Sequence, residues 1–162
     1  MPTRPRSNDL VRAILVGGLA AGTLDLVGAF ALYARSAAGA VRVMQSIAAG
    51  ALGPAAYQGG AASAVLGVAL HFLIATIWAA IFAAVTFRRH EWLAYPWLAG
   101  ALYGVFVFYA MNTLVLPLSA LHTPAWPLRF DAPLIAVHIV AVGLPIAWAT
   151  RRVSAPASAS AH

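Results

Sequence analysis

Four long runs of apolar residues, separated by short polar stretches, constrain this chain more than any other feature. The runs cover about residues 11–33, 60–87, 92–116 and 133–150. A helix needs about 20 apolar residues to cross the hydrocarbon core of a bilayer. Charged residues make up only 9% of the chain, against about 25% in soluble domains, which excludes an ordinary soluble fold. We therefore predict an all-α, four-helix bundle in the membrane, with one transmembrane domain over 1–152 and a disordered tail over 153–162.

The first run is interpreted as an uncleaved span rather than a secretory signal peptide. Arg4 and Arg6 precede it, and SAAGA at 36–40 resembles a cleavage site. The hydrophobic part of a signal peptide has about 7–15 residues. The run at 11–33 is longer, and it carries Asp25 in its interior.

Residues 36–60 differ from the four runs because they are rich in Ala and Gly. Apolar residues recur there at helical spacing: Val41, Met44, Ile47, Ala48 and Leu52. Arg42, Gln45 and Ser46 fall on another side of that helix. This pattern predicts a short amphipathic or re-entrant helix between spans 1 and 2, lying at the interface or folded back over the bundle. Gly53–Pro54 is expected to end it.

Every basic side chain is an arginine, and the arginines predict the orientation of the chain. Four spans put both termini on one face, with seven arginines there (4, 6, 12, 88, 89, 151, 152) and three on the other face (35, 42, 129). The positive-inside rule then places both termini in the cytoplasm. Because these arginines are scattered at the ends of apolar runs, we expect no nucleic-acid partner despite a net charge of +6. The tryptophans are expected mostly at the membrane interfaces, as anchors.

Four polar residues interrupt the spans: Asp25, His71, Asn112 and His138. At 1.5 Å per residue they lie about 6 to 16 Å below the outer boundary, all in the outer half of the bilayer. Asp25 and His71 each share a helix face with Gly and Ala residues, and such faces are where membrane helices touch. We therefore expect spans 1 and 2 to pack through these faces, with self-association as a further use of the same faces.

An ionisable residue inside a membrane is a candidate functional residue. We predict that the four residues bind or pass a proton, an ion or a small solute. Asp25 is the expected titrating group and His71 its partner, with His138 and Asn112 as auxiliary donors or acceptors. Three residues are candidates to cover this site from outside: Gln45, Tyr57 and Gln58.

Two other functions remain open. One is a non-catalytic assembly or accessory protein in which the polar residues are only structural. The other is a b-type haem protein with His71 and His138 as axial ligands, and the same two histidines with Asp25 also match a two-His, one-carboxylate metal site. Neither signal is specific, so no cofactor and no metal are expected. The chain has no Cys and no nucleophile or phosphate-binding motif, so we expect no enzyme activity.

Several segments resemble a family of small, uncharacterised bacterial inner-membrane proteins. They are GGLAAGTLDLVGA (17–29), QSIAAGALG (45–53), YQGGAASAVLGVALHF (57–72), YGVFVFYAMNTLVLPLSA (103–120) and HIVAVGLPIA (138–147). The resemblance implies a multi-pass protein of the bacterial inner membrane with four spans. It also implies motif residues, namely Asp25, Gln45, His71, Asn112, Pro117 and His138. It implies no substrate, cofactor or mechanism.

Overall fold

The computed structural model describes residues 7–33, 39–88, 90–128 and 130–154. Within them, every regular element is a helix, which confirms the predicted all-α class. The elements are α1 (Ser7–Tyr33), α2 (Gly39–Leu52), the 3-10 helix η1 (Gly53–Gln58), α3 (Gly60–Thr86), the 3-10 helix η2 (His90–Leu93), α4 (Pro96–Ala110), the π-helix η3 (Met111–Val115), α5 (Leu116–Leu118), α6 (Ala132–Val137), the π-helix η4 (His138–Gly143) and α7 (Leu144–Ser154). The predicted tail falls largely on 155–162, outside the described residues.

Four helices are long and apolar enough to cross a membrane: Asn8–Leu32, Gly60–Thr86, Pro96–Leu118 and Ala132–Ser154. They agree with the predicted four-helix membrane bundle, and their bounds differ from the predicted ones most clearly in two places. The third span begins at Pro96 rather than Trp92, because η2 occupies His90–Leu93 and Pro96 starts α4 in its first turn, a position where its missing N–H costs nothing. The fourth span (α6, η4 and α7 in sequence) continues to Ser154, beyond the expected Thr150.

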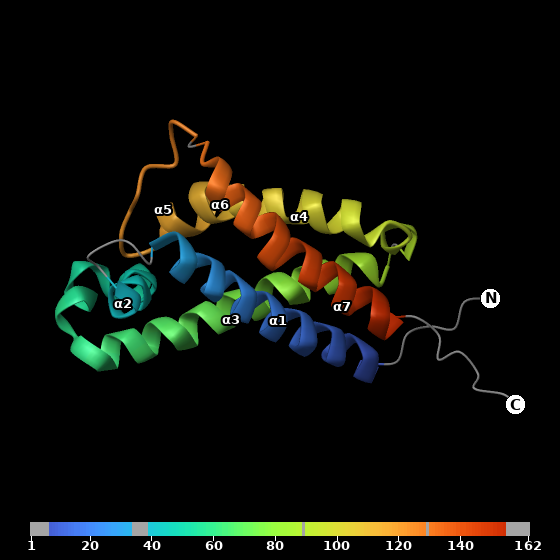
Figure 1. Ribbon diagram of the computed structural model, residues 1–162, viewed down its shortest axis with the longest axis horizontal. Coiled ribbons are helices and arrows are strands. Elements are labelled where there is room, and N and C mark those ends of the chain that lie inside the picture. Colours follow the sequence, from blue (N-terminus) through green and yellow to red (C-terminus); the bar gives the residue numbers. More distant parts are fainter. Residues whose placement is uncertain (1–6, 34–38, 89, 129, 155–162) are drawn as a thin grey trace, which may run out of the picture.

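Helix α1 and the fourth span (α6, η4 and α7) are the two inner helices of the bundle. Helix α1 packs against α3 on one side and against the fourth span on the other, and α4 packs against the far side of the fourth span. Ser7, where α1 begins, and Ser154, where α7 ends, lie at the same end of the molecule (Figure 1). We call this the termini end. The opposite end, where α2 lies, is called the cover end.

Glycines hold these helices close together, as the small-residue faces predicted. A Cβ added to Gly22 would press on Phe72 and Ala75 of α3, and one added to Gly18 would press on Thr76. A Cβ on Gly104 would meet the carbonyl of His138. These faces are therefore already used within one chain, and self-association through them remains a prediction.

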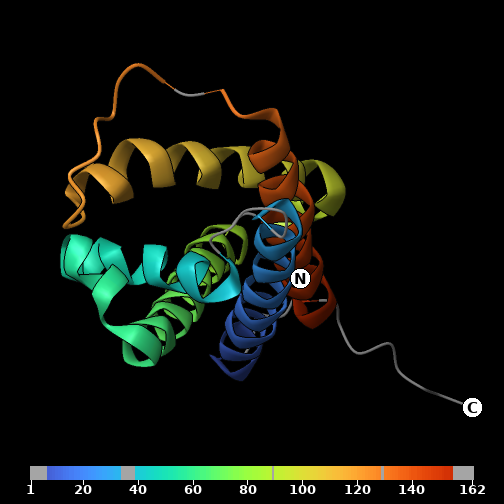
Figure 2. The same cartoon turned by 60° about the vertical axis from the view of Figure 1, so that its left-hand side comes forward.

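Helices α3 and α4 follow one another in sequence, but among the described helices they are not close-packed partners. Toward the cover end they diverge, and α2 with η1 lies between their separated ends (Figure 2). Two backbone contacts anchor α2 there. The Ala120 N–H donates to the Gly50 carbonyl oxygen (2.8 Å), and Gly67 of α3 sits directly against the Met44 carbonyl, where a Cβ would overlap it.

The side of α2 that faces the protein differs from the predicted one. Met44, Gln45, Ala48 and Ala49 are buried, whereas Val41 and Leu52 are exposed. The predicted separation of Gln45 from the apolar side of this helix is therefore wrong, since Gln45 is buried together with Met44 and Ala48. The small side chains of Ala48 and Ala49 let the α2 backbone come close to the bundle, and Gln45 can form hydrogen bonds there. The larger side chains of Val41 and Leu52 point away from the protein, toward apolar surroundings.

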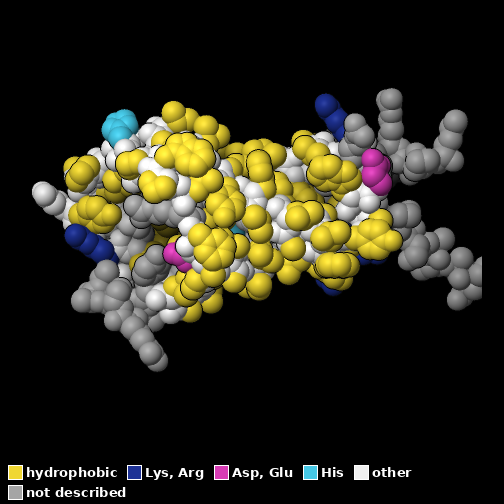
Figure 3. All heavy atoms as spheres, turned by 90° about the horizontal axis from the view of Figure 1, so that it is seen from above, with side chains coloured by type: hydrophobic (Ala, Val, Ile, Leu, Met, Phe, Trp, Pro, Cys, Tyr) yellow, Lys and Arg dark blue, Asp and Glu magenta, His cyan; other side chains and the backbone are white. Residues whose placement is uncertain are grey.

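Hydrophobic side chains cover the middle of the molecule, and the charged side chains visible from this side lie toward its ends (Figure 3). Many large apolar residues of the spans are exposed, among them Leu19, Val27, Val65 and Leu102. A soluble protein rarely exposes so much contiguous apolar surface. The four apolar helices and this surface indicate a multi-pass membrane protein in contact with the lipid bilayer.

Candidate functional site

The His71 ring connects α3 to α1. Its Nε2 lies 2.8 Å from the carbonyl oxygen of Gly22. A carbonyl oxygen only accepts hydrogen bonds, so the proton of the neutral ring resides on Nε2 and its Nδ1 is left as an acceptor. The ring also meets Phe72 edge-on, with centroids 5.5 Å apart.

His138 has the opposite proton arrangement. Its Nδ1 lies 2.9 Å from the Leu134 carbonyl oxygen, one turn earlier in the fourth span. By the same argument Nδ1 carries the proton, and Nε2 is the free acceptor. The ring packs edge-on against Phe108 of α4, with centroids 5.5 Å apart.

Asn112, on the third span, contacts Phe108, the residue that also contacts His138. Its Nδ2 donates to the Phe108 carbonyl oxygen at 2.8 Å, while the Phe108 ring contacts His138. Phe108 is only 2% exposed. The structure therefore brings Asn112 to the backbone and His138 to the ring of one buried residue.

Both residues lie in π-helical segments, which the sequence reasoning did not predict. Asn112 is in η3 and His138 begins η4. Each segment ends shortly before a proline, Pro117 or Pro145. A proline inside a helix lacks an N–H and crowds the carbonyl four residues earlier, which widens or kinks the helix. The two prolines are thus the sequence signal for these segments.

Asp25 lies between two contact faces of α1. Gly22, three residues earlier, faces α3, and Gly28, three residues later, faces Val137 of α6. At about 100° per residue, Asp25 is about 60° from each of them. Its side chain is therefore placed toward the interior between α3 and the fourth span, and it is partly buried.

The expected pair between Asp25 and His71 is not present among the described residues. His71 instead donates to Gly22, on the turn of α1 next to Asp25. The described side chains include no hydrogen-bond or ion-pair partner of the Asp25 carboxylate. We call Asp25, His71, Asn112 and His138 the polar cluster.

The candidate covering residues play three different roles. Gln45 is 5% exposed, and its Nε2 donates to the Gly60 carbonyl (3.1 Å) and to Ser63 Oγ (3.4 Å), which fastens α2 to α3. The Tyr57 ring lies under the Arg42 guanidinium at 4.2 Å, a cation–π contact. Gln58 is exposed. We call α2 and η1 together the outer cover.

An aromatic layer lies nearer the termini end. The Tyr103 hydroxyl donates to the Trp78 carbonyl (2.7 Å), and the Tyr103 ring packs on Phe82 with centroids 4.8 Å apart. Trp78 is 8% exposed and its Nε1 lies 3.4 Å from Met111 Sδ, so it is a core residue rather than an interfacial anchor. The spacing of Trp78 and Phe82, four residues apart on one helix face, was the signal available for this layer.

Comparisons with known proteins add no assignment. The chain matches no protein-family model, no curated protein and no solved structure. The resemblance to small bacterial inner-membrane proteins therefore stays a prediction.

Proposed function

We propose that the protein binds a proton or a small organic cation at the polar cluster. The direction of the hydrogen bonds carries this proposal. His71, His138 and Asn112 each donate an N–H to a backbone carbonyl. Their free atoms are acceptors (Nδ1, Nε2 and Oδ1), and Asp25 adds a carboxylate. A set dominated by acceptors is complementary to a positively charged ligand that donates hydrogen bonds.

The arrangement favours a proton or an organic ammonium ion over a metal ion. A metal needs several ligand atoms converging within about 2.0–2.6 Å. Among the described residues, no three His, Cys, Asp or Glu side chains are grouped closely enough to hold one. A proton needs one acceptor, and an ammonium ion can use acceptors spread around its N–H groups.

Binding from one side is better supported than passage through a single copy. Toward the termini end the core is a cluster of apolar side chains, among them Trp78, Phe82, Val107 and Ile146. A charged solute gains no hydrogen bonds in such a core. In this proposal the ligand reaches the cluster from the cover end, where the outer cover lies.

The orientation belongs to the same proposal. Arg12, Arg88, Arg151 and Arg152 lie toward the termini end, and Arg42 lies on the outer cover. The positive-inside rule assigns the termini end to the cytoplasm of a bacterial inner membrane. The ligand would then arrive from the outer face.

Infrared titration tests the proposal directly, because the chain has only four acidic side chains. The protein is reconstituted in nanodiscs, and pH-difference spectra follow the C=O band of protonated carboxyl groups. We expect one band to disappear in Asp25→Asn and to shift when methylammonium is added. Tetramethylammonium, which has no N–H, is expected to leave it in place.

Asp9→Asn is the matched control, since Asp9 lies near the start of α1, outside the polar cluster. It should keep both the Asp25 band and the methylammonium response. If the spectra of Asp25→Asn equal those of the unchanged protein over the whole titration, the proposal is wrong.

A structural role is the second candidate, favoured by the hydrogen bond that ties His71 to Gly22. In that case Asp25→Asn lowers stability, and the unchanged protein shows no methylammonium response. Haem ligation is less favoured, because His71 would have to release Nε2 from Gly22 before binding iron through that atom.

A further inference from the structure

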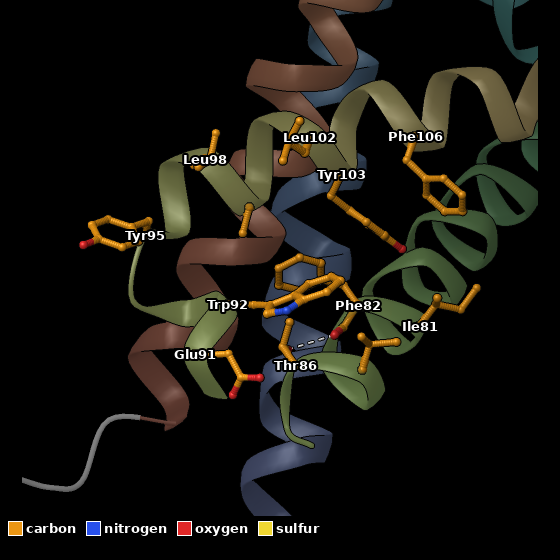
Figure 4. A pocket seen from close by; sticks show the side chains of 12 residues that line it. Ile81, Phe82, Thr86, Glu91, Trp92, Tyr95, Leu98, Leu102, Tyr103 and Phe106 are labelled. Carbon is orange, nitrogen blue, oxygen red and sulfur yellow. Dashed lines mark hydrogen bonds between the residues drawn. The ribbon is translucent and has the colours of Figure 1, made fainter. Parts of the chain in front are cut away.

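A groove of about 590 Å³ runs between α3 and α4 near the termini end (Figure 4). On the α3 side it is lined by Ile81, Phe82 and Val85, and on the α4 side by Leu98, Leu102 and Phe106. The aromatic layer bounds it, with Tyr103 lying across the gap between the two helices. The groove exists because α3 and α4 are not close-packed with each other.

The groove has mostly apolar walls, which suit a lipid molecule from the bilayer. Leu102 is 64% exposed and Phe106 is 53% exposed, although both belong to a span. In a membrane these side chains face hydrocarbon. A volume of this size matches the range of small-molecule sites, and its walls offer an acyl chain contact on several sides.

Glu91 is the charged residue among those that line the groove. It lies at the end where α3 turns into η2, below Trp92 (Figure 4). Arg88 does not line the groove; it lies two residues after Thr86, a lining residue, and is exposed. Glu91 takes part in another interaction, and the two oxygens of a carboxylate offer about four acceptor sites in all. A cation and an anion so close in sequence match a headgroup that carries both charges.

We propose that this groove binds one phosphatidylethanolamine molecule of the adjacent leaflet. An acyl chain lies between α3 and α4, the phosphate meets Arg88, and the ammonium group donates to Glu91. Phosphatidylcholine has the same net charge but no N–H donor on its headgroup, so it cannot make the last contact. Phosphatidylglycerol lacks the ammonium group. The site uses no residue of the polar cluster and stands independently of the proposed function.

Native mass spectrometry of the delipidated full-length protein in detergent tests the site, with lipids of identical acyl chains added one at a time. We expect a single adduct that forms about threefold to tenfold more tightly with phosphatidylethanolamine than with phosphatidylcholine. Glu91→Gln should remove that preference, whereas Arg42→Gln, at an exposed position on the outer cover at the opposite end of the molecule, should keep it.

Leu102→Trp narrows the groove and should weaken binding of every lipid. Leu73→Trp is its control, since Leu73 is also an exposed leucine of a span (54%) but does not line the groove. Both positions are exposed, so the variants should fold. A circular dichroism spectrum and melting curve check this.

Each result decides one part of the proposal. Equal binding of the three lipids would overturn the headgroup assignment. Adducts that persist in Leu102→Trp and weaken in Leu73→Trp would overturn the location. A dimer that forms without lipid and is lost in Leu102→Trp would show that a second copy occupies the groove, which also overturns it.

Discussion

The Tyr103 hydroxyl donates to the Trp78 carbonyl oxygen at 2.7 Å, joining α4 to α3 at a level where their backbones are not close-packed. The Tyr103 ring fills the space between them, in contact with Phe82 and Phe106. One side chain therefore forms the boundary between the apolar groove and the core of the bundle.

Tyr103→Phe tests the strength of this connection. The ring stays and the hydroxyl is lost, so the free energy of unfolding should fall by about 0.6–1.5 kcal/mol. Unfolding by titration of denaturing detergent into a mild one measures the change. Tyr95→Phe serves as the control because Tyr95 is 64% exposed, and an equal loss there would contradict the prediction.

Gly143→Ala probes the contact between the third and fourth spans. The added methyl group would overlap the Gly100 carbonyl oxygen. The overlap can be removed only if the backbones of the third and fourth spans move apart. We expect a loss of about 1–3 kcal/mol, the usual cost of overpacking. The same unfolding assay measures it.

Gly50→Ala is the matched control for that change, since its nearest neighbour would be Ser119 Cβ at 3.8 Å, an ordinary contact. Alanine also favours a helix over glycine by about 1 kcal/mol. Gly50→Ala should thus leave stability unchanged or raise it. If both variants lose stability equally, close packing at Gly143 is not the cause.

Gln45→Ala should loosen the outer cover. It removes the hydrogen bonds to Gly60 and Ser63 from a buried position, at a cost of about 1–3 kcal/mol. Hydrogen exchange should then accelerate in α2 more than in α1. Gln58→Ala, at an exposed position, should change neither rate, and equal acceleration in both variants would argue against the assigned role of Gln45.

Thr123→Val should stabilise the loop that leads to the fourth span. The Thr123 Oγ1 is buried and has no hydrogen-bond partner among the described residues. Leaving such a group unsatisfied costs about 1–3 kcal/mol, and an apolar side chain of the same shape avoids that cost. We expect a higher melting temperature for Thr123→Val. Ser119→Ala is the contrasting variant and should lower the melting temperature. It removes two hydrogen bonds, because Ser119 Oγ donates to the Leu116 carbonyl oxygen and accepts from the Leu121 N–H.

The spans could be predicted from sequence because length and apolar content alone decide whether a helix crosses a bilayer. The interfaces at Gly22 and Gly104 were also predictable, since small residues mark close contacts between membrane helices. The face of α2 was not predictable by the rule for soluble helices. In a bilayer, Val41 and Leu52 gain nothing from turning inward, so Gln45 takes the interior position instead.

The sequence singles out the four residues of the polar cluster, but it does not predict their contacts. Depth along each span placed Asp25 and His71 at similar levels. His71 contacts Gly22 rather than Asp25, which is one turn further along α1. Sequence spacing does not predict the relative position of two helices to within one turn. The groove between α3 and α4 could not be foreseen either, because consecutive helices joined by a short connection are expected to pack together.

The packing of α1 between α3 and the fourth span also sets an order of assembly. Helix α1 is synthesised first, and its partner α3 follows as the next span, so that pair can form while the rest of the chain is still being made. Helix α4 packs against the fourth span, which is made last. The third span therefore enters the bilayer before its main helical partner exists, and a chain that stops before Ala132 would leave the Gly100 and Gly104 face open to lipid.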